Sequence, residues 1–407
     1  MSANLRGARA IRARYIDAVM KVDTDIAVVG GGLVGLVSAL ALSKGGAGVT
    51  LIDSSELAGR SDPRASYLAR SSERLIRRLG VSAIGEPVGA ILVAEGEPGR
   101  PVRSGSLQFE PEGDALGSVI ENDVLREGLL DTLAKSDVVV REEVSVTGFD
   151  TAPGHVTLET DTGPVTSRLL VAADGRASPL RAMAGVGVER HDYVQRALTL
   201  TLAHSEPHGG AAYQIFFPGG PLALLPLPGN RSSVVWTDTP AAIGAAKSLP
   251  ADALAAELRH RIGGTLGDVS VLDAPVDYPL EQRLATDVTA DRLALVGDAA
   301  HVIHPLAGQG INLGLRDAAA LADVVGEAMG LGRDIGGPAL AGYARWRRGD
   351  IGGMATATDA VLHAYRLPGA LGAARRLATS LIDASPLGAW LSREAAGERP
   401  NLPSLMA

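Results

Sequence analysis

Hydrophobic positions divide the chain into segments of two kinds. Over residues 24–80, 115–185 and 290–330, short β-branched runs alternate with segments of helical periodicity, which is typical of an α/β domain around a parallel sheet. Residues 190–285 instead carry short strand-like runs separated by Pro/Gly turns, which predicts a mostly antiparallel sheet. From about residue 338 onward, Ala/Leu/Arg periodicity predicts helices. The pattern therefore predicts a discontinuous α/β domain with an inserted sheet and C-terminal helices.

The longest uncharged run extends from Ile26 to Ser43. Its length alone would suit a membrane span, which takes roughly 17–25 apolar residues. Glycines at positions 30, 31, 32 and 35 interrupt the run and separate a β-branched part from an Ala/Leu-rich part of helical character. This division favours a strand, a turn and a helix over a membrane helix.

The same run contains a G-x-G-x-x-G motif between the predicted strand and helix. Gly30 permits a tight turn, Gly32 lets the backbone approach a pyrophosphate, and Gly35 lets the helix and the strand pack closely. The N–H groups at the start of the helix, with its positive dipole end, would face the phosphates. The next strand, VTLID, ends at Asp53, where a carboxylate can accept hydrogen bonds from an adenosine ribose. The unit predicts a bound dinucleotide but does not separate FAD from NAD.

Composition and charge narrow the classes of function. The 407 residues hold 38 Lys and Arg against 46 Asp and Glu, and this net charge of −8 gives no bulk attraction to nucleic acid or to an anionic membrane. The chain has no cysteine, which excludes disulfides, thiolate-bound zinc, iron–sulfur clusters and cysteine nucleophiles. Residues 1–20 are basic and poor in acids. A targeting presequence is one interpretation of them, and a short extension ahead of the first strand is the favoured one.

Two further segments carry glycine motifs at predicted strand ends. In residues 169–181 a strand ends at Asp174-Gly175. In residues 292–317 a strand leads into Gly297-Asp298, then into the loop HPLAGQG and a helix. Together with the first motif, these segments resemble the three fingerprints of the single-component FAD-dependent aromatic hydroxylases.

Within that group the chain resembles the ubiquinone-biosynthesis hydroxylase family of para-hydroxybenzoate-hydroxylase-like flavoproteins. The resemblance extends to Asp62-Pro63-Arg64-Ala65, to Gly220-PLALLPL and to Asn401-LPSLM, and it covers nearly the whole chain. One departure is Asp53, because flavoproteins of this kind often carry Glu there; Asp is shorter but supplies the same acceptor.

The resemblance implies a discontinuous Rossmann-like FAD-binding domain with an inserted, mostly antiparallel β-sheet substrate domain and C-terminal helices. The implied boundaries are 1–20 for a basic N-terminal extension, 21–84, 113–188 and 286–337 for the FAD-binding domain, 85–112 and 189–285 for the substrate domain, and 338–407 for the C-terminal helical region.

The resemblance also assigns residues to the cofactor. Asp298 would hydrogen-bond the ribityl chain, although capping of the following helix is an alternative for this residue. The loop from His304 to Gly310 would lie against the isoalloxazine ring. The full set expected at the cofactor is Gly30, Gly32, Gly35, Asp53, Arg64, Arg126, Asp174, Gly175, Gly297, Asp298, Pro305, Gly308, Gly310 and Asn312.

The implied activity is hydroxylation of the aromatic ring of a prenylated phenol in ubiquinone biosynthesis. FAD would be reduced by NAD(P)H or by a partner reductase and would react with O₂ to give a flavin hydroperoxide, whose electrophilic terminal oxygen the electron-rich ring attacks. The residues identify no base for the phenol. His301, His304 and Pro305 are weak catalytic candidates, because the two histidines can equally serve to shape the flavin loop. The surrounding pattern assigns Asp298, His301 and His304 to the flavin and not to a metal.

Two other functions stay open beside this one. The first is an FAD-dependent hydroxylase of a soluble aromatic compound, and the second is a non-catalytic flavin-binding subunit of a biosynthetic complex. The expected location is the cytoplasm, with peripheral contact at the inner face of the membrane as an alternative. The run Tyr343-ARWRR is either a basic patch facing a membrane or partner, or an ordinary solvated helix face.

Overall fold

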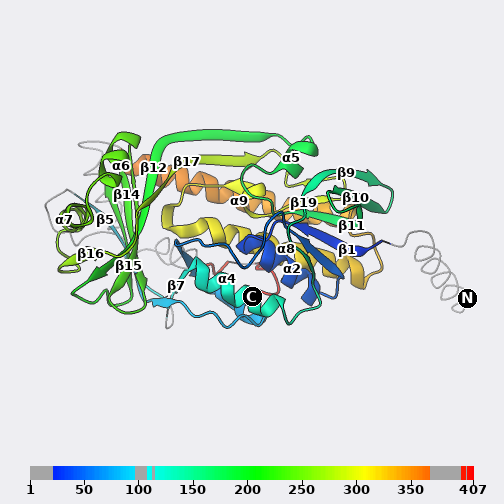
Figure 1. The fold of residues 1–407 in the computed structure, drawn as a ribbon, viewed down its shortest axis with the longest axis horizontal. Helices are drawn as coiled ribbons and strands as arrows, with labels where there is room; N and C mark the ends of the chain where they lie inside the picture. The colour runs from blue at the N-terminus through cyan, green and yellow to red at the C-terminus, as the bar shows by residue number, and fades with distance from the viewer. Residues whose placement is uncertain (1–21, 97–107, 112–114, 367–395, 400) are drawn as a thin grey trace, which may run out of the picture.

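The computed structural model describes residues 22–96, 108–111, 115–366, 396–399 and 401–407. The basic extension expected over residues 1–20, and residues 367–395 of the expected C-terminal helical region, lie outside the described residues. The molecule is elongated, with one sheet at each end (Figure 1).

The first sheet is the parallel sheet that the alternating pattern predicts. Its central strand β1 (Thr24–Val29) pairs in parallel with β2 (Val49–Ile52) and β11 (Val165–Ala172). The strand order is β18-β19-β11-β1-β2-β8, and the hairpin of β9 and β10 extends it from β11. The remaining bounds are β8 Val139–Arg141, β9 Val146–Ala152, β10 His155–Thr160, β18 Thr289–Ala290 and β19 Leu293–Leu295.

Helices complete the core of this half. They are α2 (Leu33–Lys44), α4 (Asn122–Leu133), α8 (Gln309–Gly330) and α9 (Pro338–Arg366). The uncharged run from Ile26 to Ser43 forms β1, a turn and α2, as the interrupting glycines predict. In the described part of the chain, no helix is both long enough and apolar enough to span a membrane.

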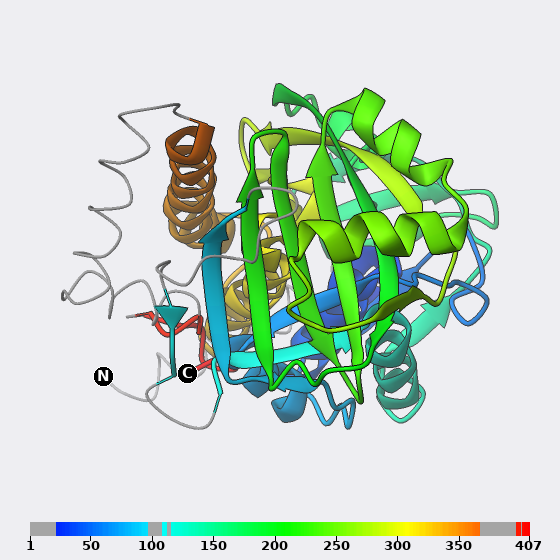
Figure 2. The ribbon, with the colours of Figure 1, turned by 90° about the vertical axis from the view of Figure 1, so that its left-hand side faces the viewer.

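The second sheet is antiparallel except where β13 pairs with β5. One of its faces packs on α6 (Pro240–Lys247) and α7 (Ala251–Arg261), which lie across it in Figure 2. The strand order is β20-β17-β12-β15-β14-β13-β5-β6, with β16 on β12. The bounds are β5 Ala90–Glu95, β6 Gln108–Phe109, β12 Val188–His204, β13 Ala211–Phe217, β14 Gly220–Leu227, β15 Arg231–Asp238, β16 Val269–Val271, β17 Val276–Ala285 and β20 His301–Val302.

Smaller elements join the two halves. A three-stranded sheet of β3, β7 and β4 lies between them, and the long strands β12 and β17 run from one half to the other (Figure 1). The bounds are β3 Ala65–Ala69, α3 Arg70–Arg78, β4 Glu86–Val88, β7 Gly117–Glu121, α5 Pro179–Met183, and the 3₁₀ turns η1 Gly297–Ala299 and η2 Leu306–Gly308. Because β1, β2, β11 and β19 are parallel, the segments that follow them meet at one edge of the first sheet.

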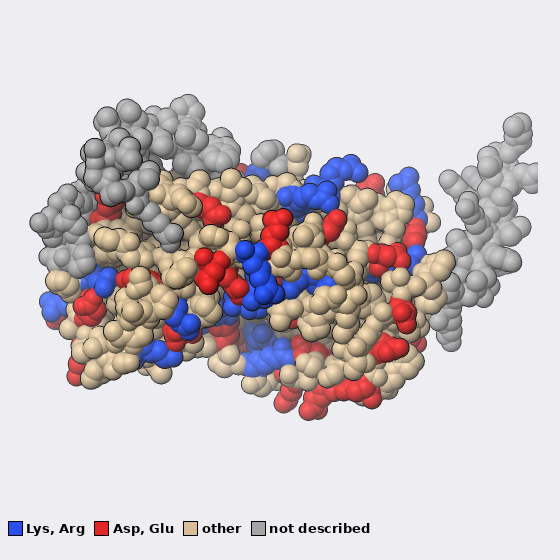
Figure 3. All heavy atoms as spheres, turned by 90° about the horizontal axis from the view of Figure 1, so that it is seen from above, with Lys and Arg blue, Asp and Glu red and all other residues tan. Residues whose placement is uncertain are grey.

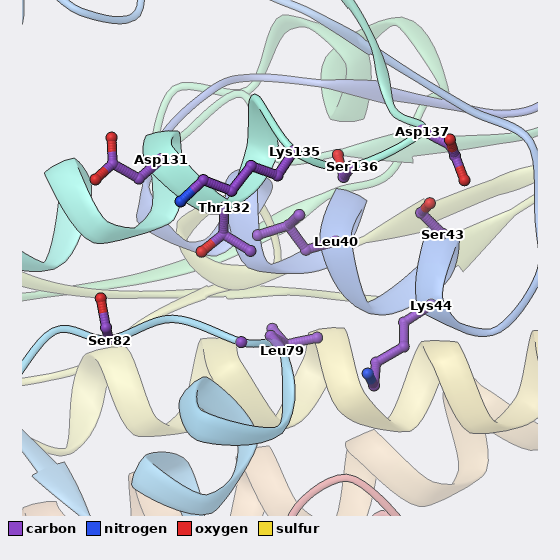
Figure 4. Close-up of a pocket in the computed structure, with 11 residues that line it drawn as sticks. Leu40, Ser43, Lys44, Leu79, Ser82, Asp131, Thr132, Lys135, Ser136 and Asp137 are labelled. Carbon is purple, nitrogen blue, oxygen red and sulfur yellow. The ribbon is translucent and has the colours of Figure 1, made fainter.

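A pocket of about 420 Å³ lies away from that edge (Figure 4). Lys44 and Ser43 at the C-terminal end of α2 line it, together with Lys135 and Asp137 beyond α4. The N-terminal end of α2 carries the glycine motif, so this pocket lies at the opposite end of the helix. It does not belong to the predicted dinucleotide site.

Candidate active site

The turn between β1 and α2 has the geometry of a phosphate cradle. A Cβ at Gly30 would overlap the carbonyl oxygen of Ala173, and one at Gly35 would overlap the carbonyl oxygen of Gly30. At Gly32, by contrast, a Cβ would meet no atom of the described residues within 4 Å. Among those residues, no side chain caps α2, and no acid lies in its first turn. The start of α2 is therefore positioned to bind an anion.

Asp53 lies beside this turn, at the end of β2. Its Oδ2 accepts a hydrogen bond from the Gly31 N–H at 2.5 Å, its Oδ1 accepts one from the Ser55 N–H at 2.9 Å, and it pairs with Arg60. Burial alone would raise the pKa of Asp53, but the bonds from Arg60 and from the Gly31 N–H outweigh it and lower the pKa. Asp53 is therefore a carboxylate at neutral pH, next to the glycine turn.

Two arginines approach the same edge from outside the parallel strands. Arg126 of α4 donates to the carbonyl oxygen of Gly31 at 3.1 Å. Arg64 makes two hydrogen bonds of 2.7 Å to Asp62, and its guanidinium carbon lies 5.8 Å from the centre of the Tyr278 ring. The hydrogen bonds to Asp62 and, more weakly, the charge of Asp298 raise the pKa of Arg64 above its ordinary value. Arg64, which belongs to the segment after β2, is therefore within electrostatic range of the segment after β19.

Asp298 is exposed in η1, directly after β19. Within the described ranges, neither η1 nor α8 has a side-chain cap, so the alternative that Asp298 caps the following helix is wrong. Its neighbour Gly297 donates its N–H to Asp317 Oδ2 at 2.8 Å. The Asp317 carboxylate thus holds the backbone of η1, while the side chain of Asp298 is exposed to solvent.

The loop before α8 holds a closely packed glycine, and the first turn of α8 holds an open one. Over the described parts of the chain, a Cβ at Gly310 would have no neighbour within 4 Å, whereas one at Gly308 would lie 3.0 Å from Tyr67 Cβ. Asn312 is buried, and its amide bonds the backbone of β3: its Nδ2 donates to Tyr67 O at 2.8 Å, and its Oδ1 accepts from Ala69 N at 2.9 Å. Asn312 therefore joins the start of α8 to β3 and fixes the position of the preceding loop relative to β3. Pro305 lies directly before η2 in this loop.

A buried charge network lies beneath the loop. His301 Nε2 is 2.6 Å from Asp317 Oδ2, and Arg347 Nε donates to Asp317 Oδ1 at 2.6 Å. Arg347 is 1% exposed and also pairs with Asp350. The membrane-facing or solvated-face interpretation of Tyr343-ARWRR is thus wrong for Arg347, because this side chain points into the core and neutralises Asp317. Tyr343 is buried as well and donates to Leu295 O at 2.8 Å.

Asp174 and Gly175 follow β11 at the same edge. Asp174 Oδ1 accepts from Ser178 Oγ at 2.6 Å and its Oδ2 accepts from Leu180 N at 3.0 Å, so the carboxylate stabilises the start of α5. Beside this turn, Arg283 donates to Arg176 O at 3.2 Å and pairs with Glu281 at 2.7 Å. Figure 3 shows charged side chains of both signs gathered around a hollow in the middle of the upper face.

An apolar cluster that the sequence interpretation did not identify lies beside the loop from His304 to Gly310, which contributes Leu306 to it. The cluster contains residues from the face of the second sheet that does not pack on α6 and α7. It also contains residues at the end of α9, and Leu306. The ring of Phe216 stacks on Tyr365 with centroids 3.7 Å apart. Three of the chain's seven tyrosines are in this cluster, namely Tyr193, Tyr278 and Tyr365. Alternation along β13, where Phe216 and Phe217 must face opposite ways, is the sequence signal that could have indicated it.

These features fit FAD. The uncapped start of α2 and the open space at Gly32 suit a pyrophosphate. The exposed carboxylate of Asp298 is an acceptor suited to a polyhydroxyl chain, and the open backbone at Gly310 allows a flat ring to approach.

Comparisons with known proteins agree with this fit. Residues 23–331 match the family described as "FAD binding domain". The chain is 38% identical over 401 residues to ubiquinone hydroxylase UbiL of Rhodospirillum rubrum, with 94% of this chain and 92% of that protein covered. It is 37% identical to 3-demethoxyubiquinol 3-hydroxylase of Escherichia coli, with 76% and 81% covered.

Solved structures share the fold at lower identity. p-Nitrophenol 4-monooxygenase PnpA from Pseudomonas putida DLL-E4 superposes with a TM-score of 0.77 at 19% identity, over 94% of this chain and 100% of that one. HpxO of Klebsiella pneumoniae, solved with FAD and uric acid, gives a TM-score of 0.73 at 19% identity, over 92% and 96%.

Proposed function

The chain belongs to the ubiquinone-biosynthesis hydroxylase family of FAD-dependent aromatic monooxygenases, and from that premise we propose that its own substrate is a prenylated phenol whose aromatic ring it hydroxylates. The observation that carries the proposal is the apolar, aromatic cluster beside the loop from His304 to Gly310. A phenol ring and the first part of an apolar tail suit such a surface. The protein's cofactor is FAD, with O₂ as oxidant and NAD(P)H or a partner reductase as electron donor.

Named residues would divide the binding of FAD between them. The start of α2 with Gly32 would hold the pyrophosphate, while Gly30 and Gly35 keep that turn tight, and Asp53 would hold the adenosine ribose. Asp298 would hold the ribityl chain. Arg64, Arg126, Asp174, Gly175 and Gly297 would shape the surrounding edge, and Pro305, Gly308, Gly310 and Asn312 would set the loop against the ring. When bound, FAD supplies the transfer of electrons and the activation of O₂.

The chain's own contribution to the reaction is to position the phenol and to exclude water. Phe216, Leu306 and Leu362 are each less than 9% exposed and pack in one cluster, which supports a dry surface for the ring. His301 is engaged by Asp317 beneath the loop, which supports a structural role for this histidine. A prenylated substrate partitions into a bilayer, and we therefore propose that the protein works in the cytoplasm and contacts the inner face of the membrane transiently.

The first test is the absorption spectrum of the purified protein with Asp298→Ala alongside. We expect bands at roughly 370 and 450 nm from oxidised flavin, reduced in the variant because a ribityl acceptor is lost. Asp291→Ala is the matched control, since Asp291 is exposed just before β19. A colourless protein that also fails to take up added FAD would contradict the proposal.

The second test compares substrates. NAD(P)H-dependent or reductase-coupled O₂ uptake should rise with a prenylated phenol, and the quinol precursor should accumulate in cells that lack the protein. Stimulation by soluble phenols alone would indicate a hydroxylase of a soluble aromatic compound. Bound FAD without turnover under any donor would indicate a non-catalytic subunit.

A further inference from the structure

Tyr193 brings a hydroxyl group into the apolar cluster beside the loop from His304 to Gly310. Tyr193 of β12 is 8% exposed and packs with Phe216, Leu280 and Leu306. Its ring lies edge-to-face with that of His304, with centroids 5.0 Å apart. Tyr193 is therefore on the side of the His304–Gly310 loop where the phenol of the proposed function would bind.

The backbone of β12 is irregular at this point. The register with β17 shifts between Asp192 and Gln195, and Val194 adopts a φ of +54°. A β-branched residue in the left-handed region is a costly conformation, and Val194 is also 68% exposed, so its own side chain gains little there. This irregularity coincides with the placement of the neighbouring Tyr193 in the apolar cluster.

The hydroxyl of Tyr193 is held by two side chains from other elements. It donates to Asp359 Oδ1 of α9 at 2.6 Å. Gln282 Nε2 of β17 donates to Tyr193 Oη at 3.3 Å and to Asp359 Oδ2 at 3.2 Å. A hydroxyl whose own proton is held by a carboxylate becomes a better acceptor for the proton of another hydroxyl.

We propose that Tyr193 accepts the proton of the substrate's ring hydroxyl while passing its own proton to Asp359, with Gln282 as the positioning residue of the pair. The proposal rests on the proposed function. The substrate O–H bond breaks as a Tyr193 O–H bond forms, and the former Tyr193 O–H bond breaks as an Asp359 O–H bond forms. No electron is transferred. The substrate is left as an electron-rich phenolate, and half-buried Asp359 can return the proton to solvent.

Other titratable groups surround the pair and belong in any pH measurement. His191 of β12 and His304 each lie edge-to-face with the Tyr193 ring, with centroids 5.0 Å apart. His363 of α9 contacts the carbonyl oxygen of Asp359 at 3.1 Å through Nδ1. Tyr193 bonds the Asp359 carboxylate directly.

The test uses the FAD-loaded protein and 4-nitrophenol, whose phenolate is coloured. We expect the wild type to ionise the bound probe at a lower pH than free probe. Tyr193→Phe and Asp359→Asn should shift the ionisation of the bound probe upward by about one pH unit or more. Both variants should also lower kcat with the prenylated phenol by about 10²-fold, the lower end of general-base effects, with KM changed little.

Tyr213→Phe is the matched control. Tyr213 is a partly buried tyrosine of the same sheet, but it packs on the cluster beneath α6 and α7, so its removal should leave both readouts unchanged. Retained flavin absorbance checks that each variant is folded. The proposal is overturned if the wild type does not ionise the probe, or if Tyr193→Phe ionises it as the wild type does. A failure of the proposed function would look different, because the wild type would then ionise the probe yet hydroxylate no prenylated phenol.

Discussion

In the first βα unit, one glycine is required by the fold and another by the space for the cofactor. Gly35 packs within α2 against the carbonyl oxygen of Gly30, whereas Gly32 faces open space with φ −69° and ψ 173°, an ordinary extended conformation. The two positions belong to one motif but obey different constraints. One is constrained by the protein itself, and the other only by whatever approaches the start of α2.

We therefore predict opposite outcomes for two conservative substitutions. Gly32→Ala should unfold at the same denaturant concentration as the wild type when free of FAD, but should bind FAD at least about tenfold more weakly, because its methyl group fills the cradle. Gly35→Ala should cost at least about 3 kcal/mol in free energy of unfolding, since backbone must move to relieve the overlap. Flavin fluorescence titration and urea unfolding measure the two effects. Equal FAD affinity in Gly32→Ala would contradict the assignment of the cradle.

At the scale of the elements, the packing of α8, α9 and η1 on one another depends on one buried carboxylate. Asp317 of α8 bonds Gly297 N of η1, His301, and Arg347 of α9. Asp317→Asn would remove one carboxylate partner of the buried Arg347 guanidinium and leave Asp350 as another. We expect a loss of about 3–5 kcal/mol in free energy of unfolding, as for other broken buried pairs, and reduced FAD retention because η1 carries Asp298. Asp287→Asn, which removes an exposed pair with Arg348, should cost less than about 1 kcal/mol.

The pH dependence of unfolding gives this network a second readout. Burial would raise the pKa of Asp317, but His301 and Arg347 together hold it below the ordinary value of 3.8. A carboxyl group with a lowered folded-state pKa stabilises the fold fully above its ordinary pKa, and this stabilisation disappears as the pH falls through the lower value. The difference between wild type and Asp317→Asn should therefore shrink as the pH falls below 3.8. A difference that grows on acidification would contradict the assigned pairing.

The elements also show how far the sequence could predict this molecule. The strand, turn and helix over Ile26–Ser43 could be predicted, because glycine spacing and hydrophobic periodicity are local properties of the chain. The burial of Arg347 could not, since its partner Asp317 lies 30 residues earlier and meets it only when α8 packs on α9. Tyr193, Gln282 and Asp359 were missed for the same reason: three elements far apart in sequence bring them together.

At the scale of the whole molecule, the two halves meet around the candidate active site. The long strands β12 and β17 connect them, and α9 extends from the FAD-binding half to the second sheet (Figure 1). The stack of Phe216 on Tyr365 is one of the contacts through which the end of α9 covers the inner face of that sheet. Removing this contact should therefore open the site to water without touching the residues assigned to FAD.

We accordingly predict that Phe216→Ala uncouples electron consumption from hydroxylation. FAD content should stay normal, while the hydrogen peroxide formed per NAD(P)H consumed should rise severalfold and the hydroxylated product should fall by about tenfold, because water exclusion is lost. Phe217→Ala is the matched control: Phe217 neighbours Phe216 on β13 but packs beneath α6 and α7, so truncation there should lower stability and leave coupling unchanged. Peroxide and product are measured in the same reaction. If both variants uncouple alike, the effect comes from general loosening of the sheet, and the end of α9 does not close the site.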